Sequence, residues 1–389
     1  MSTSRVVRDL PGSMKATTAP RETRRRGVPQ SAPLSPVAPS TDVTAKAMLG
    51  PSSSPEWEAV SNGLVTIADV PPWLQFNSFI HTGYRPAPIR VGRALRSLLQ
   101  LHNESFNVWS HLLPAAALLF WAARWAIVDE WVPSPASVLR TWPWLDWEGT
   151  IRAPLFQPGI IIASVVAMAF IFVSSSTYHL AMPCCSSAKG YQRLLCLDVV
   201  ASLVSMATTA YSFIWYGDPC APAATVHQWT MGFSIFAFTV FAVIVFVPMK
   251  VASRFLVFCV FCLVRLVVSV AVYGRQGSLT WLWFSGPPAF RHHATSFLVI
   301  FLGGLINVAR TPERWFPPCP VTMRKLKRRG GDSDGTLTVS FARLRAIDVV
   351  GNSHNLWHLT CVASAALTLQ GCFDDAEFYR YAAETSACL

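Results

Sequence analysis

Long apolar stretches separated by short polar connections fill the chain from about residue 100 onward. Seven of them approach the roughly 20 residues that a helix needs to cross the hydrocarbon core of a bilayer. They lie at about 108–128, 158–180, 194–216, 227–248, 251–273, 286–308 and 347–370. The pattern therefore predicts an all-α membrane protein, with a bundle of seven transmembrane helices formed by residues 108–371.

The composition supports a membrane protein and argues against binding to nucleic acid. Of 389 residues, 52% are hydrophobic and 14% are charged, and the mean hydropathy is +0.37, which is too apolar for an ordinary soluble protein. The net charge is +11, but Lys and Arg collect in the N-terminal stretch and in one late loop. They form no patch interleaved with aromatic residues, so we exclude a nucleic-acid partner.

The regions flanking the bundle are polar. Residues 1–55 are rich in Ser, Pro, Thr and Ala and contain no aromatic residue, so we predict a disordered basic tail. This tail has no apolar stretch after its basic residues and is therefore not a secretory signal; a transit peptide is the alternative. We predict that residues 56–107 are a cytosolic segment preceding the membrane and that residues 372–389 are a short extracytosolic tail.

Charges in the connections predict the orientation of the bundle. Lys and Arg favour the second, fourth and sixth connections, most densely between Arg310 and Arg345, whereas acids such as Asp129 and Glu377 lie in the first connection and the C-terminal piece. Cytosolic loops carry the excess of Lys and Arg, so the N-terminus is predicted to be cytosolic and the C-terminus extracytosolic. This is the inverse of a G-protein-coupled receptor, and it fits the plasma membrane and an endomembrane equally well.

One group of polar residues is predicted to share a single depth in the membrane. His354 and His358 are four residues apart and lie on one helix face, where two imidazoles can bind one metal ion. His179, at the end of the second segment, and Asp198, near the start of the third, fall at the same cytosolic depth. Three imidazoles with one open position are typical of catalytic Zn²⁺, although iron and copper also accept imidazole. In this hypothesis Asp198 handles the proton of a water, and Ser175, one turn before His179, polarises a carbonyl or holds a water.

The other polar residues in apolar segments give weaker signals. Glu104 and Asn107 precede or open the first segment; we favour a helix-entry role with capping over contact with the metal ligands. Arg265 lies midway along the fifth segment, where a carboxylate or a lipid headgroup could pair with it. The remaining histidines in or near the segments are predicted to lie outside the metal cluster: His111, His227, His292 and His293.

Several motifs, in order along about residues 70 to 371, resemble those of the progestin and adipoQ receptor family, also called the haemolysin-III-related family. They are WLQFNSFIHTGYRP (73–86), NESFNVWSHL (103–112), Ser175-x-x-x-His179, Leu197-Asp198, RTPER (310–314) and VGNSHNLWH (350–358). The first of them looks most like the fungal and plant branch.

The resemblance implies seven helices, a cytosolic N-terminus, and a zinc ion held by His179, His354 and His358 with Ser175 and Asp198 beside it. Members include adiponectin and progestin receptors and fungal proteins of zinc and lipid homeostasis. The expected partner is therefore a membrane lipid, such as ceramide, as substrate or ligand, and an extracellular ligand is a further expectation. Three functions follow: zinc-dependent hydrolysis of a lipid amide, a receptor with structural zinc, and a channel or transporter. The third is disfavoured because the buried charges, Arg265 apart, are predicted to lie in the cytosolic half.

The sequence departs from the family pattern in two places. About thirty residues, 317–346, separate the RTPER motif from the last segment, where the family has a short loop. This insertion is either a lineage-specific cytosolic loop or translated intron sequence. The family's LDYxGI motif reads Leu197-Asp198-Val199-Val200-Ala201-Ser202, so it keeps the carboxylate but lacks Tyr and Gly.

Overall fold

A computed structural model describes residues 63–128, 158–247, 249, 251–316, 322–327, 336–341 and 345–384. All of them belong to one compact unit, Pro55–Leu389. The predicted tail 1–55, the first residues of the 56–107 segment, much of the 317–346 insertion and the last five residues lie outside the described part of the chain.

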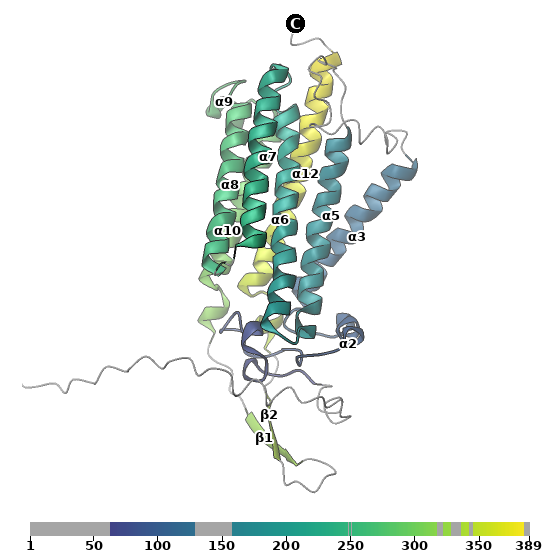
Figure 1. Cartoon of the computed structure of the whole chain (residues 1–389), viewed down its shortest axis with the longest axis vertical. Coiled ribbons are helices and arrows are strands. Elements are labelled where there is room, and N and C mark those ends of the chain that lie inside the picture. Colours follow the sequence, from purple (N-terminus) through teal and green to yellow (C-terminus); the bar gives the residue numbers. More distant parts are fainter. Residues whose placement is uncertain are drawn as a thin grey trace, which may run out of the picture. The chain divides into compact units, whose positions relative to one another are not determined.

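Seven helices in the described residues are long and apolar enough to cross a membrane, which confirms the predicted seven-helix bundle. They lie side by side in Figure 1. Their bounds are α3 Ser105–Val128, α5 Pro158–Ala181, α6 Ala188–Tyr216, α7 Ala223–Phe246, α8 Val251–Tyr273, α10 Pro288–Ala309 and α12 Ser353–Glu384.

Short elements connect and precede these helices. The helical ones are η1 Ile67–Asp69, η2 Pro72–Leu74, α2 Val91–Arg96, η3 Ser97–Leu99, η4 Met182–Cys184, α9 Leu279–Phe284, η5 Glu313–Trp315 and α11 Ala346–Val349. The insertion contributes an antiparallel hairpin of β1, Thr322–Lys327, and β2, Thr336–Phe341, which the all-α prediction missed. The run TLTVSF alternates polar and apolar residues and is rich in β-branched types, a pattern that favours a strand.

The last helix is longer than its predicted segment. We expected the apolar stretch to end near residue 370 and residues 372–389 to form a tail, but α12 continues to Glu384. The expectation was wrong because it counted only apolar residues. Asp375, in the supposed tail, is 1% exposed and accepts a hydrogen bond from the Tyr273 hydroxyl at 2.5 Å. The acidic stretch is thus part of the bundle.

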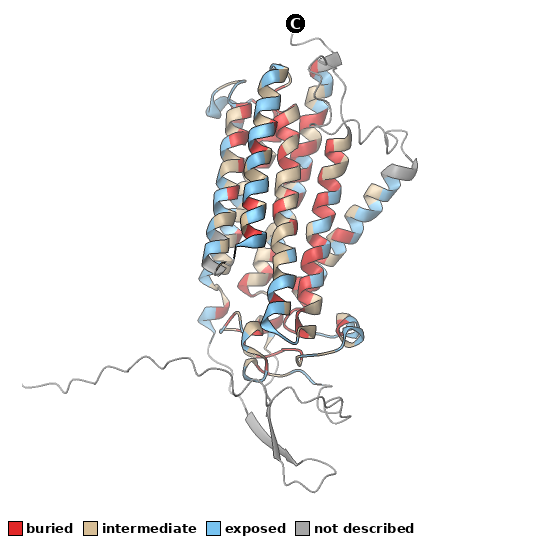
Figure 2. Ribbon diagram, viewed as in Figure 1, coloured by how far each residue is buried: buried red, intermediate tan, exposed pale blue. Residues whose placement is uncertain are grey.

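Apolar side chains fill the bundle and also cover its outside. One buried cluster joins α6, α7, α8 and α10 around Phe213, Ile244 and Phe261. Another joins α3, α5 and α12 and includes Phe172 and Leu369. The buried residues face inward in Figure 2, and many exposed outer positions are large and apolar, as expected of helices that contact lipid. The helix α5 is the most enclosed of the seven, and its four serines and His179 are buried in the interior.

Two fully buried carboxylates attach the segment before α3 to the start of α12. Glu313 accepts hydrogen bonds from the Asn77 side-chain amide at 2.9 Å, from the Ser353 backbone N–H at 2.7 Å and from the Ser353 hydroxyl. Asp348 accepts from the Thr82 backbone N–H at 2.8 Å and from the Arg345 guanidinium at 2.6 Å. Because Ser353 is the first residue of α12, the Glu313 carboxylate also lies at the positive end of that helix dipole. These contacts fix the helix turn that carries His354.

Candidate metal centre

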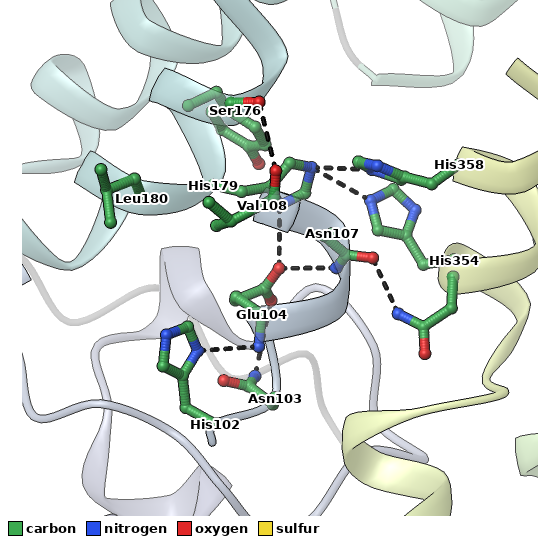
Figure 3. Close-up of polar contacts among 12 residues, drawn as sticks. His102, Asn103, Glu104, Asn107, Val108, Ser176, His179, Leu180, His354 and His358 are labelled. Carbon is green, nitrogen blue, oxygen red and sulfur yellow. Dashed lines mark hydrogen bonds and ion pairs between the residues drawn. The ribbon is translucent and has the colours of Figure 1, made fainter. Parts of the chain in front are cut away.

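Three histidine rings converge where the end of α5 meets the first two turns of α12. The Nε2 atom of His179 lies 3.1 Å from Nε2 of His358 and 3.4 Å from Nε2 of His354. Figure 3 shows both α12 rings directed at His179. One ligand atom from each ring lies within 4.8 Å of the others, and no other group of three or more His, Cys, Asp or Glu residues in the described parts of the chain meets this condition. The group could hold one metal ion.

The opposite nitrogen of each ring has its own hydrogen-bond partner. The Nδ1 atom of His179 lies 2.8 Å from Glu104 Oε2. The Nδ1 atom of His354 lies 3.4 Å from Asn307 Oδ1, and that of His358 lies 3.1 Å from Ser110 Oγ. A carboxylate and an amide oxygen can only accept, so two of these nitrogens carry the proton.

The hydrogen bonds of the Ser110 hydroxyl determine which nitrogen of the His358 ring carries the proton. It donates its proton to the Asn107 carbonyl at 3.1 Å, which leaves its oxygen to accept from Nδ1–H of His358. All three imidazoles then present a bare Nε2 lone pair to one point. Metal-binding histidines are characteristically held this way, with the other ring N–H donated to a carboxylate or another acceptor. The donor set therefore fits a metal ion.

Glu104 is part of the site, contrary to our preference for a helix-entry role. It is 2% exposed, and besides His179 it accepts a hydrogen bond from the Asn107 side-chain amide at 2.7 Å. Asn107 in turn accepts from the Asn355 amide, between the two α12 histidines, at 2.8 Å. This chain of contacts joins α12 to α5 through the start of α3. A carboxylate at the start of a helix is also a common capping residue. The sequence alone therefore could not distinguish a capping role for Glu104 from a contact with His179.

The charge on Glu104 follows from its surroundings. Burial raises the pKa of this carboxyl, but the hydrogen bonds that it accepts from His179 and Asn107 bring the pKa below its ordinary value. The carboxyl is thus ionised at neutral pH, and its negative charge raises the electron density on the ring nitrogen that faces the centre.

We predict that Glu104→Gln weakens metal binding by about 10- to 100-fold, the usual effect of losing a partner behind a metal ligand. Glutamine fills the same space and can still accept from His179, but it lacks the negative charge. Competition with a chromophoric chelator measures the affinity. Glu377→Gln, the same change at an exposed position on α12, is the control and is expected to bind as tightly as the wild type. Equal affinities for both variants would contradict the role given to Glu104.

Arg85, from the segment before α3, fixes the backbone at the end of α5. Its guanidinium donates to the carbonyl oxygens of His179 at 2.6 Å and Leu180 at 3.0 Å, and to the Ser97 hydroxyl at 3.0 Å. A cation is favourable at the unpaired carbonyls of a helix C-terminus. Burial lowers the pKa of Arg85 to about 10, against the opposing effect of Glu104, so the side chain stays charged. The backbone of one metal-site histidine is therefore held from outside its helix.

Ser175 and Asp198 meet on the α6 side of His179. The Ser175 side chain is 4% exposed, and both it and His179 lie within electrostatic range of the Asp198 carboxyl. The structure thus brings His179, His354 and His358 together, with Asp198 near His179. His111, which we predicted to lie outside the metal cluster, is buried and stacks on His358 with ring centroids 4.0 Å apart.

A second group of buried ionisable residues lies further along α8, α10 and α12. Asp375 contacts His293 at 3.0 Å, and Arg265 donates to Thr209 at 3.1 Å while its guanidinium lies over the rings of Phe213 and Phe297. We expected buried charges, Arg265 apart, to lie only at the end that carries the three histidines. That expectation was wrong because Asp375 had been assigned to the tail.

Comparison with known proteins gives a consistent result. A family model described as haemolysin-III related matches residues 99–369, a range that includes all three histidines. The chain is 28% identical over 305 residues to human progestin and adipoQ receptor family member 4, covering 77% of this chain and 89% of that protein. It is 21% identical to the adiponectin receptor protein of Drosophila melanogaster, covering 81% of this chain and 60% of that protein. It is 27% identical to the ADIPOR-like receptor IZH2 of Saccharomyces cerevisiae over 44% of this chain and 48% of that protein.

Proposed function

Because this chain belongs to the haemolysin-III-related family, we propose that it is a membrane receptor that uses a zinc ion to hydrolyse the amide bond of a ceramide-like lipid. The output would be a signal in lipid and metal homeostasis. The observation that carries the proposal is the convergence of three Nε2 atoms, each on a ring whose Nδ1 is held by a separate partner.

The chemistry of the donor set favours zinc in a catalytic site. Three protein ligands leave a fourth position for water or substrate, which is the arrangement of catalytic rather than structural zinc. When bound, the ion would polarise a carbonyl and make a water more acidic. No other described His, Cys, Asp or Glu completes a four-ligand set with the histidines.

Asp198 and Ser175 would supply the proton chemistry. In our proposal the Asp198 carboxylate accepts a proton from the attacking water, whose oxygen forms the new bond to the amide carbon. The same proton then passes to the nitrogen as the carbon–nitrogen bond breaks, giving a fatty acid and an amine. The Ser175 hydroxyl, which lies near Asp198, would orient the carboxyl for both transfers. The long acyl chain would enter from the bilayer between the apolar helices.

A receptor with structural zinc is the second candidate. The ligands come from α5 and α12, and their Nδ1 partners from α3, α10 and the residue before α3, so an ion would tie four helices together. In that case an extracellular or lipid ligand would act by changing helix packing, without hydrolysis.

Zinc removal and return distinguishes these candidates. Purified protein is stripped with a chelator, reloaded with zinc, and supplied with ceramide, and the fatty acid released is measured. We expect release to stop on stripping and to return in proportion to bound zinc. A reloaded, folded protein that releases no fatty acid would favour the structural reading.

We also propose that the N-terminus lies in the cytosol and the C-terminus outside it. Besides the loop charges, support comes from Cys220, in the connection between α6 and α7, which is disulfide-bonded. Disulfides persist in oxidising compartments and are rare in the cytosol. This connection lies at the end of the bundle opposite the three histidines, which puts the candidate metal centre near the cytosolic face.

The orientation predicts which cysteine can be labelled from outside. In sealed vesicles with the extracytosolic face outward, an impermeant maleimide should modify Cys220 only after treatment with an impermeant reductant. Cys185 is a free thiol in the connection between α5 and α6, at the opposite end of the bundle from Cys220. It is the matched control and should react only after the membrane is permeabilised. The opposite pattern, identified by peptide mass, would reverse the topology.

A further inference from the structure

Asp375 is the centre of a buried polar cluster far along α12 from the three histidines. Its Oδ1 accepts from the Tyr273 hydroxyl of α8 at 2.5 Å. Its Oδ2 accepts from Nε2 of His293 of α10 at 3.0 Å and from the Ser212 hydroxyl of α6 at 3.3 Å. Asp375 and His293 are each 1% exposed, and Tyr273 is fully buried. Four helices therefore meet at one carboxylate.

The cluster has one open position. Nε2–H of His293 is used on Asp375, and Nδ1 of the same ring is buried without a hydrogen-bond partner among the described residues. The residues around the carboxylate offer donors, whereas a metal cation needs acceptors, and no metal-binding group includes them. A bare imidazole nitrogen next to a carboxylate is suited to a proton, because an added proton converts the pair to imidazolium and carboxylate, which stabilise each other.

The other charged and titratable groups around His293 and Asp375 are engaged in other contacts or are neutral. On α8 these are Tyr273 and, further along, Arg265, whose guanidinium is engaged with Thr209 and two aromatic rings. On α12 the buried Cys372 thiol lies one turn before Asp375. Ser212 on α6 is neutral. Intramembrane acids and histidines arranged in this way are typical of proton-binding sites and relays.

A similar pair lies next to the cluster in the sequence and closer to the surface. His292 and Asp374 are the neighbours of His293 and Asp375 along the same two helices, and His292 Nδ1 lies 2.7 Å from Asp374 Oδ2. The His292 side chain is 34% exposed, so it can exchange protons with solvent. Gln370 donates to the other Asp374 oxygen at 2.8 Å and holds this outer pair in place.

We propose that His293 and Asp375 form a proton-binding site, loaded through the His292–Asp374 pair from the side of the membrane on which α12 ends. The proton comes from solvent and forms one N–H bond at Nδ1 of His293. The net charge of the two side chains changes from −1 to 0, and no other bond is made or broken. The site is independent of the three-histidine centre and of the proposed hydrolysis.

Imidazole NMR of the full-length, histidine-labelled protein in detergent tests this site. We expect one buried histidine resonance to change from neutral imidazole to imidazolium as the pH is lowered, and to be absent in His293→Gln. In Asp375→Asn the resonance should remain and stop titrating, because a buried imidazolium without a carboxylate is too costly. A His293 resonance that stays neutral throughout, or that titrates equally well in Asp375→Asn, would overturn the proposal.

Two further variants guard against misfolding and misassignment. Tyr273→Phe removes only the hydroxyl and should change the chemical shift of the same resonance, since the two rings lie 6.4 Å apart. His292→Gln should leave the titrating resonance present while slowing its proton exchange; unchanged exchange would overturn the entry route. Zinc binding that matches wild type in each variant shows that the protein is folded, and it separates failure of this proposal from failure of the metal centre.

Discussion

His358→Ala is expected to abolish stoichiometric metal binding, with affinity falling by more than about 100-fold, the upper end of the effect of removing only a supporting partner. The His358 ring is 2% exposed, and its Nε2 is the nitrogen nearest to that of His179, at 3.1 Å. Alanine leaves two imidazoles and a space on the third side. Metal content of the purified, monodisperse protein, measured by mass spectrometry, gives the result directly.

The control for this variant removes a histidine that has no part in the site. His227 on α7 is exposed, and His227→Ala should keep the wild-type metal content. Retention of one tightly bound metal by His358→Ala would show that the ion lies elsewhere. Loss of metal from both variants would point to damage from purification rather than to the ligand.

The sequence was sufficient to predict the features that depend on one simple physical requirement, such as the length of a membrane-spanning helix. Apolar stretches of membrane-spanning length predicted the seven helices, and the alternating direction of successive helices placed His179 and the α12 histidines at one end of the bundle. The i, i+4 spacing of His354 and His358 required only a helix. Each of these inferences depends on local pattern and on depth, which a membrane imposes on every span alike.

Contacts between distant segments were harder to predict. Glu104 could be a cap or a partner of His179, and only the packing of α3 against α5 decides between them. Asp375 lies past the end of the apolar stretch, so a criterion based on hydropathy placed it in a tail. Its burial depends on donors from α6, α8 and α10, which no local pattern reveals.

Asp198→Asn is expected to separate metal binding from hydrolysis. Asparagine keeps the size of the side chain but cannot take up a proton at the pH of the reaction, and loss of a general base typically costs about 10²- to 10⁴-fold in rate. Asp198 is not one of the three ligands, so zinc content should stay at the wild-type level. Fatty-acid release from ceramide under saturating substrate measures the rate.

Two comparisons make the Asp198 result specific. Glu377→Gln removes one carboxylate from the exposed surface and should hydrolyse at the wild-type rate. Ser175→Ala removes the hydroxyl that we propose orients Asp198 and should give a smaller loss than Asp198→Asn. A larger loss in Ser175→Ala would mean that the serine, rather than the carboxylate, performs the chemistry.

The most direct test of zinc-dependent hydrolysis is to compare fatty-acid release from ceramide by wild type and Asp198→Asn, each loaded with one equivalent of zinc. We expect equal zinc in both proteins, continuing release by the wild type, and release by the variant that is lower by about 10²- to 10⁴-fold. Equal rates in the two proteins, or no release by the zinc-loaded wild type, would contradict it.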